Sequence, residues 1–184
     1  GAVFSGAGAS MQLLVLNRTF RSGGLDIPLK PVVASLIGLK PESLDEFHPV
    51  LNVLQWFIEE AEPMNYGRLY FEAKDAMGAP PSVLVTEGMK DLMVPAIAAE
   101  AFAASIGAPV IEPSAREVEA LVLKGIDSVS APVSGNCADG ASTCGLAQYP
   151  DDGHFAIYDN PSAWNRYAEF LGSLADTAKP GTIK

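Results

Sequence analysis

Three short apolar runs along the chain are typical of buried strands. The chain opens on "GAVFSGAGAS", residues 1–10, an apolar run that closes on small residues. "PSVLVTEG", residues 81–88, is the clearest strand, because its aliphatic residues are bounded by Pro and Gly. "GLAQYP", residues 145–150, predicts another strand. Helical patterns separate these runs, and strands that alternate with helices indicate an α/β fold with a parallel sheet.

Helix signals lie between and after the second and third strands. Pro95 suits the first turn of a helix that Gly107 caps at its C-terminus. Ser114 and Glu117 have capping-box spacing and predict the start of a short helix in "SAREVEALVLKG". Further along, Asn160 predicts the cap of a last helix, with Pro161 in its first position. This helix has an apolar face formed by Trp164, Tyr167, Phe170, Leu171 and Leu174, and we expect the tail from Lys179 to be frayed.

Residues 11–78 form a long segment without a strand signal, which we interpret as a helical insertion. "FHPVLNVLQWFIEEAEP" predicts a helix that begins near Pro49, and His48 is interpreted as a helix-start residue. The apolar residues of this helix go almost all the way round. It is therefore expected to be buried or to cover an apolar cavity. Trp56, Phe57 and Tyr66 are interpreted as packing residues, with a place in a substrate pocket as the alternative.

Composition narrows the function classes. The net charge of −10 and the lack of a basic cluster argue against nucleic acid as a partner. No apolar run is long enough to span a membrane, and there is no leader of the signal-peptide kind. Six residues, Gly and Asp among them, lie between Cys137 and Cys144, and this spacing favours a disulfide over two unpaired thiols. A disulfide indicates an oxidising compartment, and no metal site is predicted.

Asp91 and His154 each follow the carboxyl end of a predicted strand by a few residues. In open parallel sheets the functional loops lie beyond these ends. An aspartate can accept the proton of one imidazole nitrogen and so orient a histidine that acts as a base. Each residue also has a structural alternative. Asp91 could cap the helix near Val94, and His154 could pair in its own turn with one of the two aspartates of "PDDGH".

The pattern around both residues resembles the α/β-hydrolase superfamily. "VLVTEGMKDLMVP" is similar to the penultimate strand and acid loop of that superfamily, where G-x-x-D-x-x-V-P recurs; Gly88, Asp91, Val94 and Pro95 match it. "DGHFAIYDNPSAWNRYAEFL" is similar to its last strand, histidine loop and closing helix. The opening strand, residues 1–10, resembles the strand after the nucleophile-bearing helix. Other phrases, among them "HPVLNVLQWF" and "NYGRLYF", resemble secreted bacterial lipases and lipoprotein-type hydrolases.

The resemblance implies the C-terminal part of an α/β-hydrolase parallel sheet, residues 79–184, with a helical cap insertion, residues 11–78. Asp91 would be the triad acid and His154 the triad base of a carboxylic-ester hydrolase. There is no G-x-S-x-G in the chain, and Ser5 lacks the leading glycine of that motif, so the nucleophile is expected upstream. The chain alone is expected to be inactive, and its aggregation-prone opening edge is expected to make it poorly soluble.

The implied substrate is a small apolar ester or lipid, and the implied partner is the missing N-terminal half of the same protein. No cofactor is implied, and the expected location is extracytoplasmic: secreted, periplasmic or surface-anchored in a bacterium. Two alternatives remain open. The same scaffold can carry out acyl transfer, dehalogenation or epoxide opening, the last two with an aspartate nucleophile. A non-catalytic secreted binding protein can also retain the fold.

Overall fold

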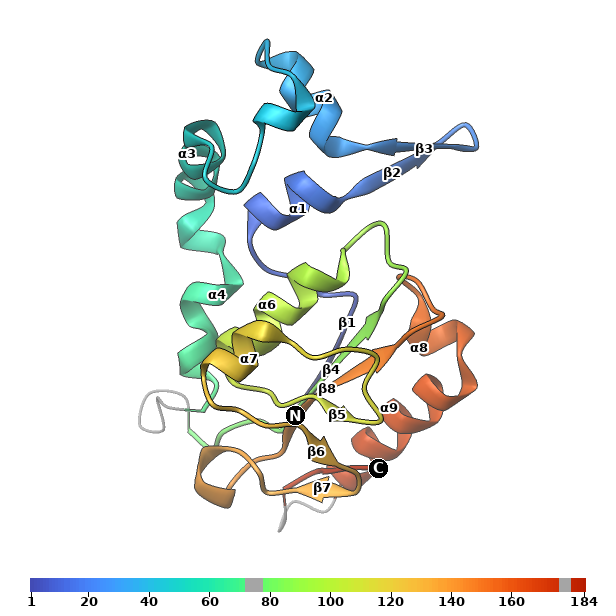
Figure 1. Ribbon diagram of the computed structural model, residues 1–184. Helices are drawn as coiled ribbons and strands as arrows, with labels where there is room; N and C mark the ends of the chain where they lie inside the picture. The colour runs from blue at the N-terminus through green and yellow to red at the C-terminus, as the bar shows by residue number, and fades with distance from the viewer. Residues whose placement is uncertain (72–77, 176–179) are drawn as a thin grey trace.

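A small parallel sheet lies at the centre of the molecule (Figure 1). The computed structural model describes residues 1–71, 78–175 and 180–184. The strand order is β1-β4-β8, formed by β1 (Ala2–Ser5), β4 (Val83–Gly88) and β8 (Cys144–Tyr149), and both pairings are parallel. The three apolar runs of the sequence are therefore strands, and the mixed α/β class is confirmed. Because β1 pairs with β4 alone within the described residues, its other edge is open.

Helices cover both faces of this sheet. On one face α6 (Ala96–Ile106) packs against residues of β4 and β8 that include Val83, Val85 and Leu146. On the other face α9 (Pro161–Ser173) packs against Leu84 and Ala147 through the fully buried ring of Phe170. The helix α6 ends at Gly107 and α9 begins after Asn160, as predicted, whereas Pro95 directly precedes α6 and does not lie in its first turn. Gly107 ends α6 in the left-handed conformation, and the side chain of Asn160 accepts hydrogen bonds from the first turn of α9.

The segment between β1 and β4 contains a β-hairpin as well as helices. Its elements are α1 (Met11–Asn17), β2 (Thr19–Ser22), β3 (Leu25–Pro28), α2 (Leu29–Leu36), η1 (Pro41–Ser43), α3 (Pro49–Ile58), η2 (Glu59–Ala61), α4 (Pro63–Tyr66) and η3 (Gly67–Leu69). The expectation of no strand in residues 11–78 is therefore wrong. The signal was the Gly23-Gly24 pair, since both residues have positive φ and a Gly-Gly turn suits a two-residue hairpin.

The helix α3 begins at Pro49 with His48 as its cap, as predicted, because the His48 Nδ1 accepts a hydrogen bond from the Val50 N–H at 3.2 Å. Of the two expectations for this helix, burial is wrong. Among its apolar residues only Leu51 is fully buried, whereas Trp56 is 71 % and Phe57 75 % exposed. The insertion has a small core of its own, formed by Val15, Ala34, Leu44 and Leu51. A core of this size can bury only one narrow side of α3.

Short elements surround the sheet: β5 (Ile111–Glu112), α7 (Glu119–Leu123), β6 (Val129–Ser130), β7 (Val133–Ser134), η4 (Ala138–Gly140), α8 (Ala156–Asp159) and β9 (Thr182–Ile183). The predicted capping box does not form, because α7 begins only at Glu119 and Ser114 bonds to the Glu112 carboxylate instead. The tail was expected to be frayed. Lys179 lies outside the described residues, but β9 pairs with β7 and Ile183 is fully buried.

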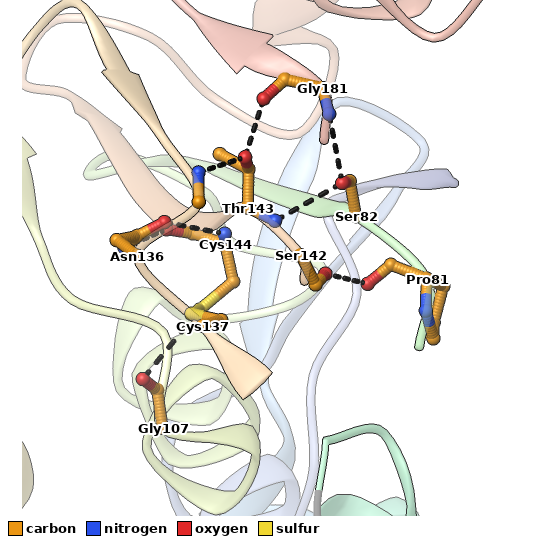
Figure 2. The surroundings of a disulfide bond; sticks show 10 residues. Pro81, Ser82, Gly107, Asn136, Cys137, Ser142, Thr143, Cys144 and Gly181 are labelled. Atoms are coloured by element: carbon orange, nitrogen blue, oxygen red, sulfur yellow. Dashed lines mark hydrogen bonds between the residues drawn. A yellow bond between two sulfur atoms is a disulfide. The ribbon is translucent and has the colours of Figure 1, made fainter. Parts of the chain in front are cut away.

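Cys137 and Cys144 form the predicted disulfide at the amino end of β8, with their Cα atoms 5.9 Å apart (Figure 2). The Ser82 hydroxyl accepts hydrogen bonds from the N–H groups of Thr143 and Gly181, both at 3.1 Å. The Thr143 hydroxyl in turn bonds to the Gly181 carbonyl. The disulfide loop therefore ties the C-terminal strand to the sheet, at the end opposite to Asp91 and His154. It fits an oxidising compartment, and none of the described helices is long and apolar enough to cross a membrane.

We expect the disulfide to stabilise the fold. Closing the short Cys137–Cys144 loop, with a sequence separation of 7, contributes about 2–3 kcal/mol through the entropy of the unfolded chain. Urea unfolding of the Cys137→Ala/Cys144→Ala variant should give a free energy lower by about that amount. Reductant should destabilise the wild type equally and leave the variant unchanged. A wild type that titrates as two free thiols would contradict the assignment.

Candidate functional site

Asp91 and His154 are in direct contact at the carboxyl end of the sheet. The Nδ1 of His154 lies 2.8 Å from the Oδ2 of Asp91, and the Asp91 side chain is only 2 % exposed. The other oxygen, Oδ1, accepts hydrogen bonds from the N–H groups of Met93 at 2.7 Å and Val94 at 2.9 Å. A carboxylate facing Nδ1 fixes that nitrogen as the proton donor, so Nε2 is left as the acceptor. This is the arrangement of an oriented base.

These contacts bear on the two structural alternatives, a helix cap for Asp91 and an ion pair within its own turn for His154. Asp91 does bond the turn before α6, but it uses one oxygen for the turn and the other for the histidine. His154 does not pair in its own turn. Asp151 bonds instead to the Lys90 ammonium at 2.8 Å, and Asp152 accepts a hydrogen bond from the Asn160 amide at 2.7 Å.

The loop that carries Asp91 and the loop that carries His154 are held together by backbone contacts. The N–H of Met89 bonds to the Tyr149 carbonyl and that of Lys90 to the Asp152 carbonyl, both at 2.9 Å. Gly88 allows this approach, since a Cβ there would lie 2.2 Å from the Gly153 carbonyl oxygen. The glycine of the G-x-x-D pattern therefore has a physical reason, because a side chain would push the two loops apart.

The imidazole of His154 reaches across the sheet from β8 to the end of β1. A Cβ built on Gly6 would lie 2.7 Å from both Nδ1 and Cε1 of His154. Gly6 has a φ of 58° and directly follows β1, the strand at the open edge. The ring thus packs on a bare stretch of backbone beside that edge. Among the described residues, no hydrogen bond to Nε2 is formed, and Ser5 is not a partner of the ring.

A cavity of about 450 Å³ adjoins the pair. The β2-β3 hairpin forms one wall, and its Thr19 N–H bonds to the Leu92 carbonyl at 2.8 Å. The acid and histidine loops form the other wall. The lining residues are Arg18, Thr19, Phe20, Arg21, Asp26, Lys90, Leu92, Met93, His154 and Phe155. Trp56, Phe57 and Tyr66 are absent from this lining. The hairpin residues were missed from the sequence because the hairpin itself was missed.

A buried polar network lies one residue before Gly88, on the α6 face of the sheet. The Glu87 carboxyl accepts a hydrogen bond from the Gln148 amide at 2.9 Å, and its Oε2 has no partner among the described residues. Glu100 lies nearby and pairs with Arg116 at 2.6 Å. Burial, with a smaller contribution from the Glu100 charge, raises the pKa of Glu87 to about 8. Glu87 is therefore protonated at neutral pH.

This raised pKa predicts a pH dependence of stability. The folded protein binds the Glu87 proton up to pH about 8, whereas the unfolded chain releases it near 4.5. Stabilisation by this group is complete below pH 4.5 and is lost as the pH rises to about 8. Glu87→Gln should remove a fall in unfolding free energy of up to about 1.4 kcal/mol per pH unit in that window. Urea titrations across this pH range measure it.

The exposed Glu117 offers a matched control, because Glu117→Gln makes the same chemical change outside the core. This variant should keep the pH dependence of the wild type. A Glu87→Gln profile parallel to that of the wild type would contradict the assignment of a proton to the folded carboxyl.

Within the described ranges, no group of three or more His, Cys, Asp or Glu side chains is placed to hold a metal ion. Comparison of the chain with protein-family models, with curated proteins and with solved structures found no match.

Proposed function

We propose that this chain is the C-terminal part of a serine hydrolase of α/β-hydrolase type that acts on carboxylic esters. The observation that carries the proposal is the buried Asp91 carboxylate bonded to Nδ1 of His154, at the carboxyl ends of adjacent parallel strands. The acid follows β4 and the base follows β8, the order that the family pattern implies. The extracytoplasmic location is part of this proposal and is supported by the disulfide.

The nucleophile would be supplied from outside these residues, next to the open edge of β1. His154 lies over Gly6 at the end of that edge strand, so a residue on a strand added beside β1 would be within reach of the imidazole. Residues 1–10 and 79–184 would then be parts of one sheet, with residues 11–78 as its cap. The backbone N–H groups that bind the oxyanion would come from the same external segment.

In this mechanism the serine hydroxyl attacks the ester carbonyl while Nε2 of His154 accepts its proton. Asp91 holds the ring in the required tautomer and stabilises the imidazolium that forms. The imidazolium then donates its proton to the departing alcohol as the acyl-enzyme forms. A water molecule attacks the acyl group while His154 accepts its proton, and the imidazolium then returns that proton to the serine oxygen as the free acid departs.

The first test is the residue at the nucleophile elbow. The reading frame upstream of Gly1 should encode G-x-S-x-G between a strand and a helix, and the protein expressed from the complete coding region should hydrolyse p-nitrophenyl esters. An aspartate at the elbow would replace ester hydrolysis with halide or epoxide chemistry. An elbow without any nucleophile would favour the binding protein, and the proposal would then be wrong.

Variants of the pair should lose activity without losing the fold. Asp91→Asn is expected to lower kcat about ten-thousandfold, because the amide no longer selects the tautomer of His154. His154→Asn should lower it at least as much. Asp151→Asn is the matched control, since it removes a carboxylate from the same loop that pairs only with Lys90 on the surface. It should keep kcat within about twofold. Equal losses in all three would refute the assigned roles.

Gly6→Ala tests the position of the ring. The added methyl group would lie 2.7 Å from two atoms of His154, so the imidazole must move, and kcat is expected to fall about a hundredfold. Gly23 gives a matched control. Its φ of 59° is close to the 58° of Gly6, but nothing lies within 4 Å of its Cβ position. Gly23→Ala should share the backbone strain and keep the activity. Full activity in Gly6→Ala would place the ring elsewhere.

A further inference from the structure

The cavity beside His154 contains a guanidinium without a polar partner. Arg18 lines this cavity, and its Nε is buried with no hydrogen bond. Within the part of the chain that the structure describes, its side chain forms no hydrogen bond or ion pair. Its Cζ lies over the Phe20 ring, 4.8 Å from the ring centroid. Buried donors in proteins are normally paired. An unpaired one in a cavity wall therefore points to a ligand.

The other cations of the cavity are already paired. Arg21 bonds to Asp26 at 3.0 Å and Lys90 bonds to Asp151 at 2.8 Å, and both pairs are exposed. Among the described residues Arg18 has no acidic partner, although the chain carries 22 acidic residues against 12 basic ones. Since the net charge of −10 repels anions at long range, attraction of an anion has to come from a local cation.

The backbone holds Arg18 in place from both sides. Its N–H bonds to the Leu14 carbonyl at the end of α1, at 2.9 Å, and its carbonyl accepts a hydrogen bond from Leu29 at the start of α2, at 2.8 Å. The stacked Phe20 ring limits the side chain further. The ring contact restricts the conformations of the guanidinium, which reduces the entropy that it loses when it binds an anion.

We propose that Arg18 binds a carboxylate at the far end of the ester substrate. The inference rests on the proposed function and makes it more specific: the substrate has an apolar body against Phe20, Leu92 and Phe155, and a carboxylate that pairs with the guanidinium. A planar carboxylate matches the guanidinium fork with two parallel hydrogen bonds. A singly charged group also suits a strongly acidic protein better than a phosphate dianion.

The experiment compares two esters that differ only in this charge. The p-nitrophenyl monoester of adipic acid carries a terminal carboxylate, and p-nitrophenyl hexanoate is its neutral counterpart. In the protein from the complete coding region, kcat/KM should be about ten- to hundredfold higher for the charged ester. Arg18→Gln should abolish this preference through KM of the charged ester and leave the neutral ester within about twofold.

Two further variants keep the test decisive. Arg18→Lys retains the charge without the fork and should keep part of the preference. Arg68→Gln removes an exposed arginine that is absent from the cavity lining, and should keep all of it. An equal loss for both esters in Arg18→Gln, or a wild type that prefers the neutral ester, would overturn the inference.

Binding measurements separate this inference from the proposed function. By calorimetry, hexanoate should bind more tightly than hexanamide, and Arg18→Gln should remove the difference. If no ester is hydrolysed and this difference persists, the proposed function is wrong and the carboxylate site stands. If esters are hydrolysed without any dependence on Arg18, the carboxylate site is wrong and the hydrolase stands.

Discussion

The site depends on the hydrogen bonds of one buried group, the Asp91 carboxylate. Burying a carboxylate costs free energy unless both of its oxygens accept hydrogen bonds. In Asp91 each oxygen has its own hydrogen-bond donor. The Met93 and Val94 N–H groups bind one, and the His154 imidazole binds the other. The same residue therefore shapes the entry into α6 and orients the ring.

The loops around this carboxylate were largely predictable, because short-range signals specify them. Gly88 marks a position that a side chain would block, and Asn160 marks a helix start. Asn160 acts on its neighbours in sequence, whereas Gly88 is required by the approach of Gly153 in the other loop. The apolar runs before them placed Asp91 and His154 at strand ends. Their contact across 63 residues followed from the expectation that β4 and β8 are parallel neighbours.

The insertion was predictable only in part, because tertiary packing decides its structure. The apolar run of α3 suggested burial, but the core of the insertion has room for little beyond Leu51. The hairpin was missed because each of its strands has only four residues, so the alternation of Leu25, Asp26 and Ile27 is too short to stand out beside the Gly23-Gly24 turn. The cavity wall was missed with it. Nothing around Arg18 in sequence shows that its guanidinium lacks a partner, since pairing depends on which side chains meet in three dimensions.

The two parts of the site are thus held by different means. The acid–base pair is fixed by backbone contacts between the loops after β4 and β8. The hairpin instead belongs to a segment with its own small core, joined to the sheet domain near the site through bonds such as Thr19 N–H to the Leu92 carbonyl. A substitution on the hairpin that spares this core can therefore change the cavity wall while the pair stays in place. Under the proposed function, substrate selection by Arg18 could therefore vary independently of the proton transfer proposed for His154.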